Sequence, residues 1–217
     1  MGDTREPSGS AGPMLIACAL GIEKLALRAG ARSGAAGEVT ILRTGMGPVN
    51  AGRAVRAACR TGPLAEAAVV ASGFCAGLAP GMHPGDLVVV DEVGLGGTPT
   101  VCTRTDLLVK AVAKAVPGRT VHTGPLIGVD HVVRGPERAR LLATGAIAAD
   151  MESAATLNSA LEAGPRPVAA VRVVVDAPEH ELVRIGTLRG GISAFRVLHS
   201  VMPAFFEWHR SLLLPRR

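Results

Sequence analysis

Apolar residues group along this chain in short uninterrupted runs, and between the runs they recur at helical spacing. Runs of this kind predict strands that are buried on both faces, and the stretches between them predict amphipathic helices. The predicted strands cover residues 14–20, 39–42, 65–77, 85–93, 120–130, 146–150 and 167–176, and the predicted helices cover 21–30, 48–60, 105–116, 135–144 and 152–164. This alternation predicts an α/β fold of three layers, in which helices cover both faces of a mostly parallel central sheet.

Single residues set the expected ends and faces of some helices. Ile22, Leu25 and Ala26 fall on one face of the first predicted helix, and Gly30 would end that helix. Thr105 would cap the helix over 105–116 through its side chain.

The length and composition fit one domain. With 217 residues, of which 48% are hydrophobic, the chain can bury one sizeable core. Residues 1–13 are polar and rich in turn-forming residues, so we expect a disordered tail there and a single domain over 14–217. No apolar run is long enough to cross a membrane, and no secretory signal is visible, which predicts a cytoplasmic protein.

Charge and cysteine content argue against several kinds of partner. Only 2% of the residues are aromatic, too few for a surface that stacks nucleic-acid bases. The formal net charge is +5, but the basic residues are spread along the sequence, so we expect no nucleic-acid partner. The four cysteines lack metal-ligand spacing, which predicts reduced, buried thiols and no metal site.

Carboxylates stand where predicted strands end. Glu23 follows the first strand, Asp150 and Glu152 close the strand over 146–150, and Asp176 closes the last strand. In α/β sheets ligands bind outside the carboxyl ends of the strands. Burying an unpaired carboxylate costs roughly 2 to 7 kcal/mol, so we expect these groups to be paired or used in chemistry.

Four segments carry a resemblance to a known family: "RTGMGPVNA", "ASGFCAGLAPGMHPGDLVVVDEV", "AADMESAA" and "AAVRVVVDAP". In this order they resemble the purine nucleoside phosphorylase superfamily, and most closely its methylthioadenosine/S-adenosylhomocysteine nucleosidase branch. The short length and basicity also look like the hopanoid-associated phosphorylases. The resemblance implies a mixed, nucleoside phosphorylase-like sheet and a homodimer or larger homo-oligomer.

The resemblance implies cleavage of the N-glycosidic bond of a 5′-substituted purine nucleoside, with adenine as the base. The reaction passes through an oxocarbenium-like sugar, so it needs an acid, a group that stabilises positive charge, and a nucleophile. Asp176 matches the acid that protonates purine N7, Glu152 the ligand of the ribose hydroxyls, and Glu23 the base that activates water. From the residues alone, Asp176 also fits a helix N-cap, and Glu23 and Glu152 fit first-turn helix acids.

The resemblance also implies substrate-binding positions. Met151 would lie against the ribose, Val132 and Val133 around the adenine, and Arg172 would help to hold the acid. Asp150 is expected to be structural and paired with a basic neighbour. The implied substrate-binding residues are Gly45, Gly73, Phe74, Val132, Val133, Met151 and Arg172.

The nucleophile stays open between water and phosphate. Family phosphorylases carry an arginine where this chain has Ala71, and its absence favours water. Arg43, Arg28 or an arginine of a partner subunit offers a substitute phosphate anchor. No cofactor is implied, and inorganic phosphate is the one co-substrate left open. Phe74 and Val175 replace polar family residues, so a nucleoside-binding protein without turnover is an alternative, whereas no dinucleotide-binding glycine motif is present.

The 5′ side of the site is expected to be open. Only about ten residues separate the strand over 85–93 from the helix over 105–116, where nucleosidases carry a longer excursion. An open end would admit a bulky substituent such as that of adenosylhopane, as well as those of methylthioadenosine, S-adenosylhomocysteine or futalosine. The segment 195–217, split or kinked by Pro203, joins Phe, Trp and Leu to basic residues and would either touch a membrane or pack as the last helix.

Overall fold

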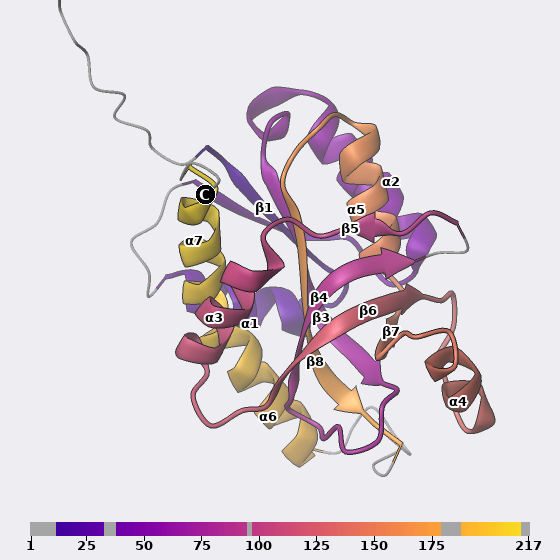
Figure 1. Cartoon of the computed structure of the whole chain (residues 1–217). Helices are drawn as coiled ribbons and strands as arrows, with labels where there is room; N and C mark the ends of the chain where they lie inside the picture. Colours follow the sequence, from indigo (N-terminus) through magenta and orange to yellow (C-terminus); the bar gives the residue numbers. More distant parts are fainter. Residues whose placement is uncertain (1–11, 33–37, 95–96, 179–187, 214–217) are drawn as a thin grey trace, which may run out of the picture.

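The computed structural model describes residues 12–32, 38–94, 97–178 and 188–213 (Figure 1). Most of the predicted tail, residues 1–11, lies outside these ranges. The elements are β1 (Met14–Cys18), α1 (Gly21–Ala31), β2 (Val39–Arg43), α2 (Pro48–Arg60), a 3₁₀ turn (Gly62–Leu64), β3 (Ala68–Gly77), β4 (Leu87–Gly94), β5 (Thr100–Val101), α3 (Thr105–Ala115), β6 (Val121–Gly128), α4 (Pro136–Leu142), β7 (Ala148–Asp150), α5 (Ser153–Glu162), β8 (Val168–Asp176), α6 (Leu188–Ser200) and α7 (Met202–Ser211).

One strand, β3, organises the sheet because it changes its partner halfway along. It pairs in parallel with β1 over Ala68–Ala71 and antiparallel with β7 over Ala76–Gly77. On its other edge it pairs with β8, and the pairings of β8 with β4, β4 with β6 and β6 with β7 return to β3. Strands β4, β6 and β7 therefore run opposite to β1, β2, β3 and β8, which gives a mixed sheet in which parallel pairings predominate.

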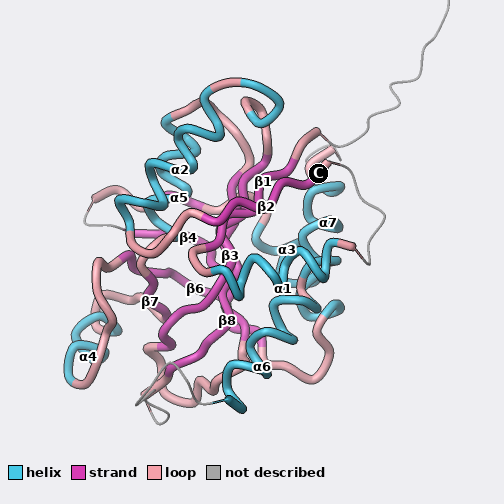
Figure 2. The backbone as a smooth tube through the Cα atoms, turned by 180° about the vertical axis from the view of Figure 1, so that it is seen from behind, coloured by secondary structure: helices cyan, strands magenta, loops and turns pink. Residues whose placement is uncertain are grey.

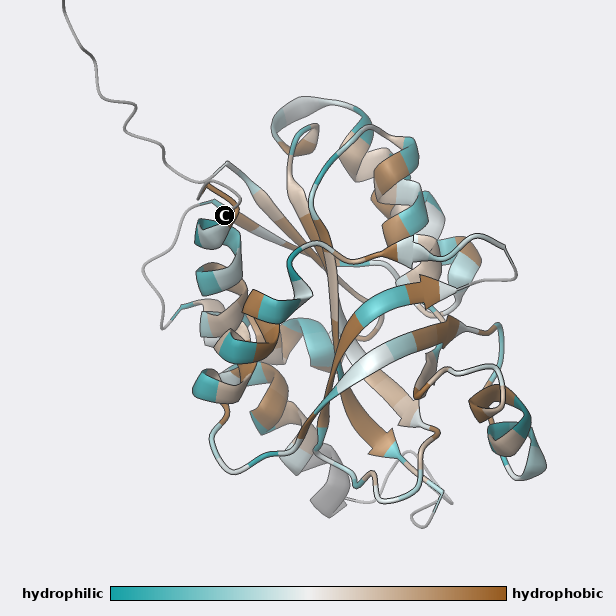
Figure 3. Cartoon of the chain, in the orientation of Figure 1, coloured by the Kyte–Doolittle hydropathy of each residue, from teal (hydrophilic) through white to brown (hydrophobic). Residues whose placement is uncertain are grey.

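Helices cover both faces of this sheet, which confirms the predicted α/β fold (Figure 2). Helices α1, α3, α6 and α7 share one hydrophobic core cluster with the sheet, and α2 and α5 share the other. Along β8, Val171 and Val173 enter the first cluster while Ala170 and Val174 enter the second. This alternation places strand residues in apolar surroundings on both sides. Figure 3 shows the hydrophobic colours running along the central strands.

The first helix packs through only one residue of the predicted face, Ala26. Ile22 and Leu25 are 49% and 62% exposed, whereas Glu23, Ala26, Leu27 and Gly30 are buried. The apolar positions misled the prediction because the buried face of α1 carries a carboxylate. Gly30 also lies inside α1 and does not end it: a Cβ there would come 2.2 Å from the backbone oxygen of His199, so the glycine lets α1 and α6 approach closely.

Two further expectations on helix ends can be compared with the structure. Thr105 is the first residue of α3, not its cap, because Arg104 precedes it in a left-handed conformation and no side chain caps the helix. The predicted split at Pro203 is confirmed, since α6 ends at Ser200 and Pro203 lies in the first turn of α7.

The C-terminal segment packs as the last helix layer. Phe205, Phe206 and Trp208 are at most 5% exposed and belong to the core cluster under α1 and α3. The exposed aromatic surface that suggested membrane contact is therefore absent from the described residues of this segment. None of the described helices combines the length and apolar character that crossing a bilayer requires. The four cysteines are buried free thiols, as predicted.

Candidate active site

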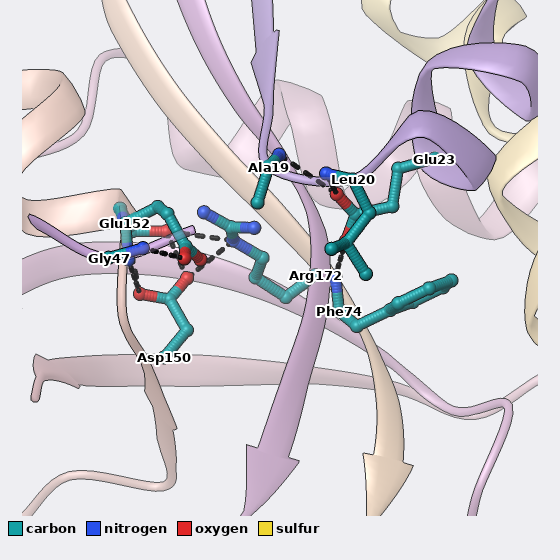
Figure 4. A network of polar contacts seen from close by, with 9 residues as sticks. Ala19, Leu20, Glu23, Gly47, Phe74, Asp150, Glu152 and Arg172 are labelled. Carbon is teal, nitrogen blue, oxygen red and sulfur yellow. Dashed lines mark hydrogen bonds and ion pairs between the residues drawn. The ribbon is translucent and has the colours of Figure 1, made fainter. Parts of the chain in front are cut away.

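The partner change of β3 leaves residues 72–75 without a strand neighbour on that edge. The carboxyl end of β1 reaches this stretch from one direction, and the carboxyl end of β7 reaches it from the other. Backbone groups here are free to bond side chains. The topology thus brings Glu23, which follows β1, and Glu152, which follows β7, to the same part of the sheet (Figure 4).

Glu23 is bound by three backbone amides. Its Oε2 accepts hydrogen bonds from the N–H groups of Ala19 and Leu20 at 2.9 and 2.7 Å, and its Oε1 accepts one from Phe74 N–H at 2.9 Å. The side chain is buried, and this burial raises the pKa of Glu23, although Arg172 and the backbone amides act against the shift. Oε1 keeps acceptor capacity, so this carboxylate can still take a proton.

Glu152 ties the end of β7 to the turn after β2. It is the N-cap residue of α5, and its Oε1 accepts a hydrogen bond from Gly47 N–H at 2.8 Å. Gly47 has φ +88°, a backbone conformation that favours glycine. Burial raises the pKa of Glu152, so its surroundings are not those of an exposed first-turn acid.

Arg172 of β8 lies between these carboxylates (Figure 4). Its Nε donates to Ser153 Oγ at 2.8 Å and lies 2.6 Å from Asp150 Oδ2, which confirms that Asp150 is paired with a basic residue. Asp150 also accepts from Ser153 N–H at 2.9 Å and so supports the start of α5. Burial alone would lower the pKa of Arg172, but Asp150, Glu152 and Glu23 outweigh it and raise the pKa.

Gly73 is the point where Glu23 and Arg172 meet. Its φ is +151°, and a Cβ at this position would come 2.5 Å from Glu23 Oε1 and 2.7 Å from Arg172 Nη1. Any side chain would therefore displace one of them. Arg172 Nη1 is buried and has no hydrogen-bond partner among the described residues. The donor Arg172 Nη1 and the acceptor Glu23 Oε1 thus both lie close to Gly73 of β3, and each can make a further hydrogen bond.

Asp176 belongs to a second, separate ion pair. It is buried at the end of β8, opposite Ala76, and contacts Arg138 Nη2 of α4. Arg138 Nη1 donates to Gly77 O at 2.9 Å, which fixes α4 to the end of β3. The guanidinium of Arg138 thus lies directly beside the Asp176 carboxyl group. Residues 179–187, where a helix capped by Asp176 was expected to run, lie outside the described residues.

Asp176 and Arg172 lie four residues apart on the same strand. At about 3.3 Å per residue this corresponds to roughly 13 Å along the backbone. The register of β3 and β8 shifts between Cys75 and Ala76, so that Val175 is an extra residue at this bulge. Bulges often re-aim side chains next to binding sites. A ligand lying along β8 would span the two ion pairs.

The remaining predicted residues fall in three places. Met151 is half-buried between Asp150 and Glu152, and Gly45 has φ +85° in the turn after β2. Val133 is buried in a small apolar cluster near α4, whereas Val132 is exposed. Arg43 is exposed at the end of β2 and lies near the first residue of α1, because a Cβ on Gly21 would be 3.7 Å from its Nη1.

Residues 30–187 match the family model described as the phosphorylase superfamily. The chain belongs to the phosphorylase superfamily. The resemblance read from the four segments is therefore confirmed at the level of the superfamily, whose enzymes cleave glycosyl bonds. The assignment to hopanoid-associated phosphorylases stays a prediction. A search of curated proteins finds no match to this superfamily member.

Solved structures support the same fold for this superfamily member. The methylthioadenosine/S-adenosylhomocysteine nucleosidase of Neisseria meningitidis, in complex with methylthio-immucillin-A, is 19% identical with a TM-score of 0.70, and the match covers 89% of this chain and 99% of that one. The futalosine hydrolase of Helicobacter pylori is 14% identical with a TM-score of 0.71, covering 94% and 99%. The purine nucleoside phosphorylase of Toxoplasma gondii is 16% identical with a TM-score of 0.69, covering 93% of each chain.

Sequence reasoning missed Arg138. This arginine lies in a short predicted helix. Two nearby arginines, Arg134 just before the helix and Arg140 within it, are exposed. No periodicity singles out the one that turns inward, because its burial depends on the carboxylate of Asp176 and on Gly77 O. In this superfamily member the cation beside the proposed acid thus comes from α4, whereas Arg172, the residue expected to hold that acid, bonds Asp150 and Ser153.

Proposed function

We propose that this protein cleaves the N-glycosidic bond of a 5′-substituted purine nucleoside and uses water as the nucleophile. One observation carries the proposal: three buried carboxyl groups, Glu23, Asp150 and Glu152, surround the single guanidinium of Arg172. A site with this excess of acids favours a sugar that becomes cationic in the transition state. It also disfavours an anionic nucleophile such as phosphate.

Glu23 is the proposed base. Burial raises its pKa, which strengthens it as a proton acceptor, and Oε1 keeps acceptor capacity beyond the bond from Phe74 N–H. Arg172 Nη1 approaches the same point beside Gly73 and offers a donor. A water held between these two groups would be oriented by the donor and deprotonated by the carboxylate.

Glu152 and Met151 are proposed to hold the sugar. The carboxylate of Glu152 is fixed by Gly47 N–H through one oxygen, which leaves the other oxygen for ribose hydroxyls. Met151 is half-buried next to it and would contact the apolar face of the ring. The base would extend from there along β8 toward Asp176, with Val132 and Val133 on the α4 side.

Asp176 is the proposed acid toward purine N7. In the structure its carboxylate is held by Arg138, so protonation of the base requires this pair to loosen when the nucleoside binds. The contact of Arg138 Nη2 with Val133 O at 3.5 Å links the pair to the segment proposed to surround the base. Arg138 would thus sense whether the base site is filled.

Phosphorolysis is the second candidate, and Arg43 is the observation that favours it. This arginine lies beside the N-terminus of α1, a place where anions are stabilised. Ala71, which replaces the family arginine, is buried in the core and supplies no charge. Phosphate would therefore rely on Arg43 while facing the carboxylate of Glu23.

The 5′ substituent and the assembly belong to the same proposal. The short connection from β4 to α3 supports an open 5′ side, which suits methylthioadenosine, S-adenosylhomocysteine, futalosine or the lipid-bearing adenosylhopane. Met46 and Val49, 62% and 78% exposed, flank Gly47 and would be covered by a second copy in a cytoplasmic homodimer.

The test is release of free base by the purified protein from each of these nucleosides, with and without inorganic phosphate. We expect release at the same rate in both conditions and a sugar product with a free anomeric hydroxyl. A phosphate requirement with a sugar 1-phosphate product would replace water by phosphate. Tight nucleoside binding without any release would overturn cleavage and support the nucleoside-binding protein.

A further inference from the structure

The net positive charge of the chain comes from one stretch of the sequence, which includes the edge strand β2. Residues 21–60, from α1 to α2, contain seven basic and two acidic residues, so this stretch alone carries the formal net charge of +5 and the rest of the chain sums to zero. One of the two acids, Glu23, is buried in the site. Of the two helices in this stretch, α1 packs against β2 at the edge of the sheet, whereas α2 packs against α5.

Helix α1 lies beside β2 (Figure 2), and it carries Lys24 and Arg28, with Arg32 directly after its last residue. These three cations, together with the exposed Ile22 and Leu25, form what we call the α1–β2 surface. Lys24, Arg28 and Arg32 are four residues apart, so they lie along one line of the helix. Together with residues 39–41 of β2 they line a cleft of about 470 Å³. Within the described ranges, the ion pairs involve none of these three cations.

Apolar side chains accompany the cations on the exposed side of α1. Leu25 is 62% exposed and Ile22 is 49% exposed, while the opposite side of the helix packs into the core. Cationic and apolar side chains together on an exposed helix face suit the surface of an anionic bilayer, where charges meet headgroups and apolar groups enter the interface. A nucleic acid would use the charges but would leave Leu25 and Ile22 in water.

We propose that the α1–β2 surface docks this protein on anionic phospholipid bilayers. The docked helix carries Glu23 on its inner side, so the site would lie close behind the membrane contact. The proposal depends neither on the substrate nor on the nucleophile. Each Lys or Arg near an anionic leaflet strengthens binding roughly fivefold, so the three cations together contribute on the order of a hundredfold. Added salt screens this attraction.

The experiment is co-sedimentation of the full chain with phosphatidylcholine vesicles that contain or lack phosphatidylglycerol. We expect binding to the anionic vesicles only, and its loss at high salt. The triple variant Lys24→Glu, Arg28→Glu, Arg32→Glu should lose on the order of a hundredfold or more in partitioning. Leu25→Ser should reduce partitioning severalfold while leaving the net charge unchanged.

The matched control is Lys110→Glu, Lys114→Glu, Arg210→Glu, which makes the same change in net charge at exposed positions of α3 and α7. Equal loss in both triple variants would mean attraction by net charge alone and would overturn the proposal. Absence of vesicle binding, or binding abolished by free inorganic phosphate at matched ionic strength, would overturn it too. Circular dichroism checks folding, and the corresponding glutamine variants replace any triple variant that unfolds.

Discussion

Two buried arginines organise the site in different ways. Arg172 is surrounded by three carboxyl groups, those of Glu23, Asp150 and Glu152, whereas the ion pair described for Arg138 is with Asp176. The first cluster has an excess of acids, which suits a proton acceptor and a cationic sugar. In the second, Arg138 contacts the Asp176 carboxyl, so the proposed proton donation requires this contact to change. The cluster around Arg172 is therefore a preformed part of the site, whereas the Asp176–Arg138 pair has to rearrange for the proposed chemistry.

The two regions also differ in how the fold holds them. Glu23 lies in the first turn of α1, Glu152 is the N-cap of α5 and Arg172 lies inside β8; each is held by backbone amides or neighbouring side chains. Asp176 is the last residue of β8, and its partner comes from a helix of seven residues. Rigid support is what positions catalytic groups, and segments at element ends more often move. The cluster around Arg172, proposed to bind the sugar, should therefore tolerate substitutions less well than the Asp176–Arg138 pair, proposed to bind the base.

The largest expected effect is the loss of turnover in Asp176→Asn. This change removes the proposed proton of the acid, so we expect base release to slow by about 10² to 10⁴-fold while nucleoside affinity changes only a few-fold. Rates of base release and calorimetric binding measure the two quantities. Asp130→Asn, at an exposed aspartate, is the control and should keep the wild-type rate. An unchanged rate in Asp176→Asn would remove Asp176 from the acid role.

The next effect concerns stability and compares the two arginines directly. Arg172→Met leaves three buried carboxyl groups without their cation, so we expect a loss of about 3 to 5 kcal/mol in the free energy of unfolding. Arg138→Met removes the cation beside Asp176 and should cost less. Arg56→Met, which breaks an exposed pair with Glu162, should stay within about 1 kcal/mol. Urea denaturation ranks the three variants, and a smaller loss for Arg172→Met than for Arg138→Met would contradict the comparison.

Much of this picture could be predicted from the sequence. The uninterrupted apolar runs predicted the strands, because strands covered on both faces leave a strong composition signal. Glu23, Glu152 and Asp176 became candidate site residues because they follow or end predicted strands. In such sheets ligands bind outside the carboxyl ends of the strands. The glycine at position 73 also fits its site, where no Cβ could stand beside Glu23 and Arg172.

Other features depend on contacts between distant segments and left no local signal. The reversed direction of β4, β6 and β7 follows from the partner change of β3, which no single run encodes. Burial of Arg138 depends on Asp176, and these residues are 38 positions apart in the sequence. The packing face of α1 was predicted only in part. The buried face contains the carboxylate of Glu23, which a search for apolar positions does not select, and the apolar Leu25 is exposed. The local sequence pattern predicts helices and strands well. The direction of the strands and the partners of buried charged residues are decided by contacts between distant segments.

The smallest expected effect is a change in how stability depends on pH. Burial raises the pKa of Glu152 above its ordinary value of 4.5, so between that value and the raised one the folded protein binds more protons than the unfolded chain.

The contribution of Glu152 to stability is then fully present below pH 4.5 and is lost as the pH rises through the folded pKa. Glu152→Gln cannot ionise, so its free energy of unfolding should fall less steeply with rising pH, by at most about 1.4 kcal/mol per pH unit. Urea denaturation at a series of pH values measures the slope, and Glu66→Gln, at an exposed glutamate, should follow the wild type. A Glu152→Gln curve that is parallel to the wild type would mean that the cluster around Arg172 carries no buried charge at this position. The contrast with the Arg138–Asp176 pair would then rest on Glu23 and Asp150.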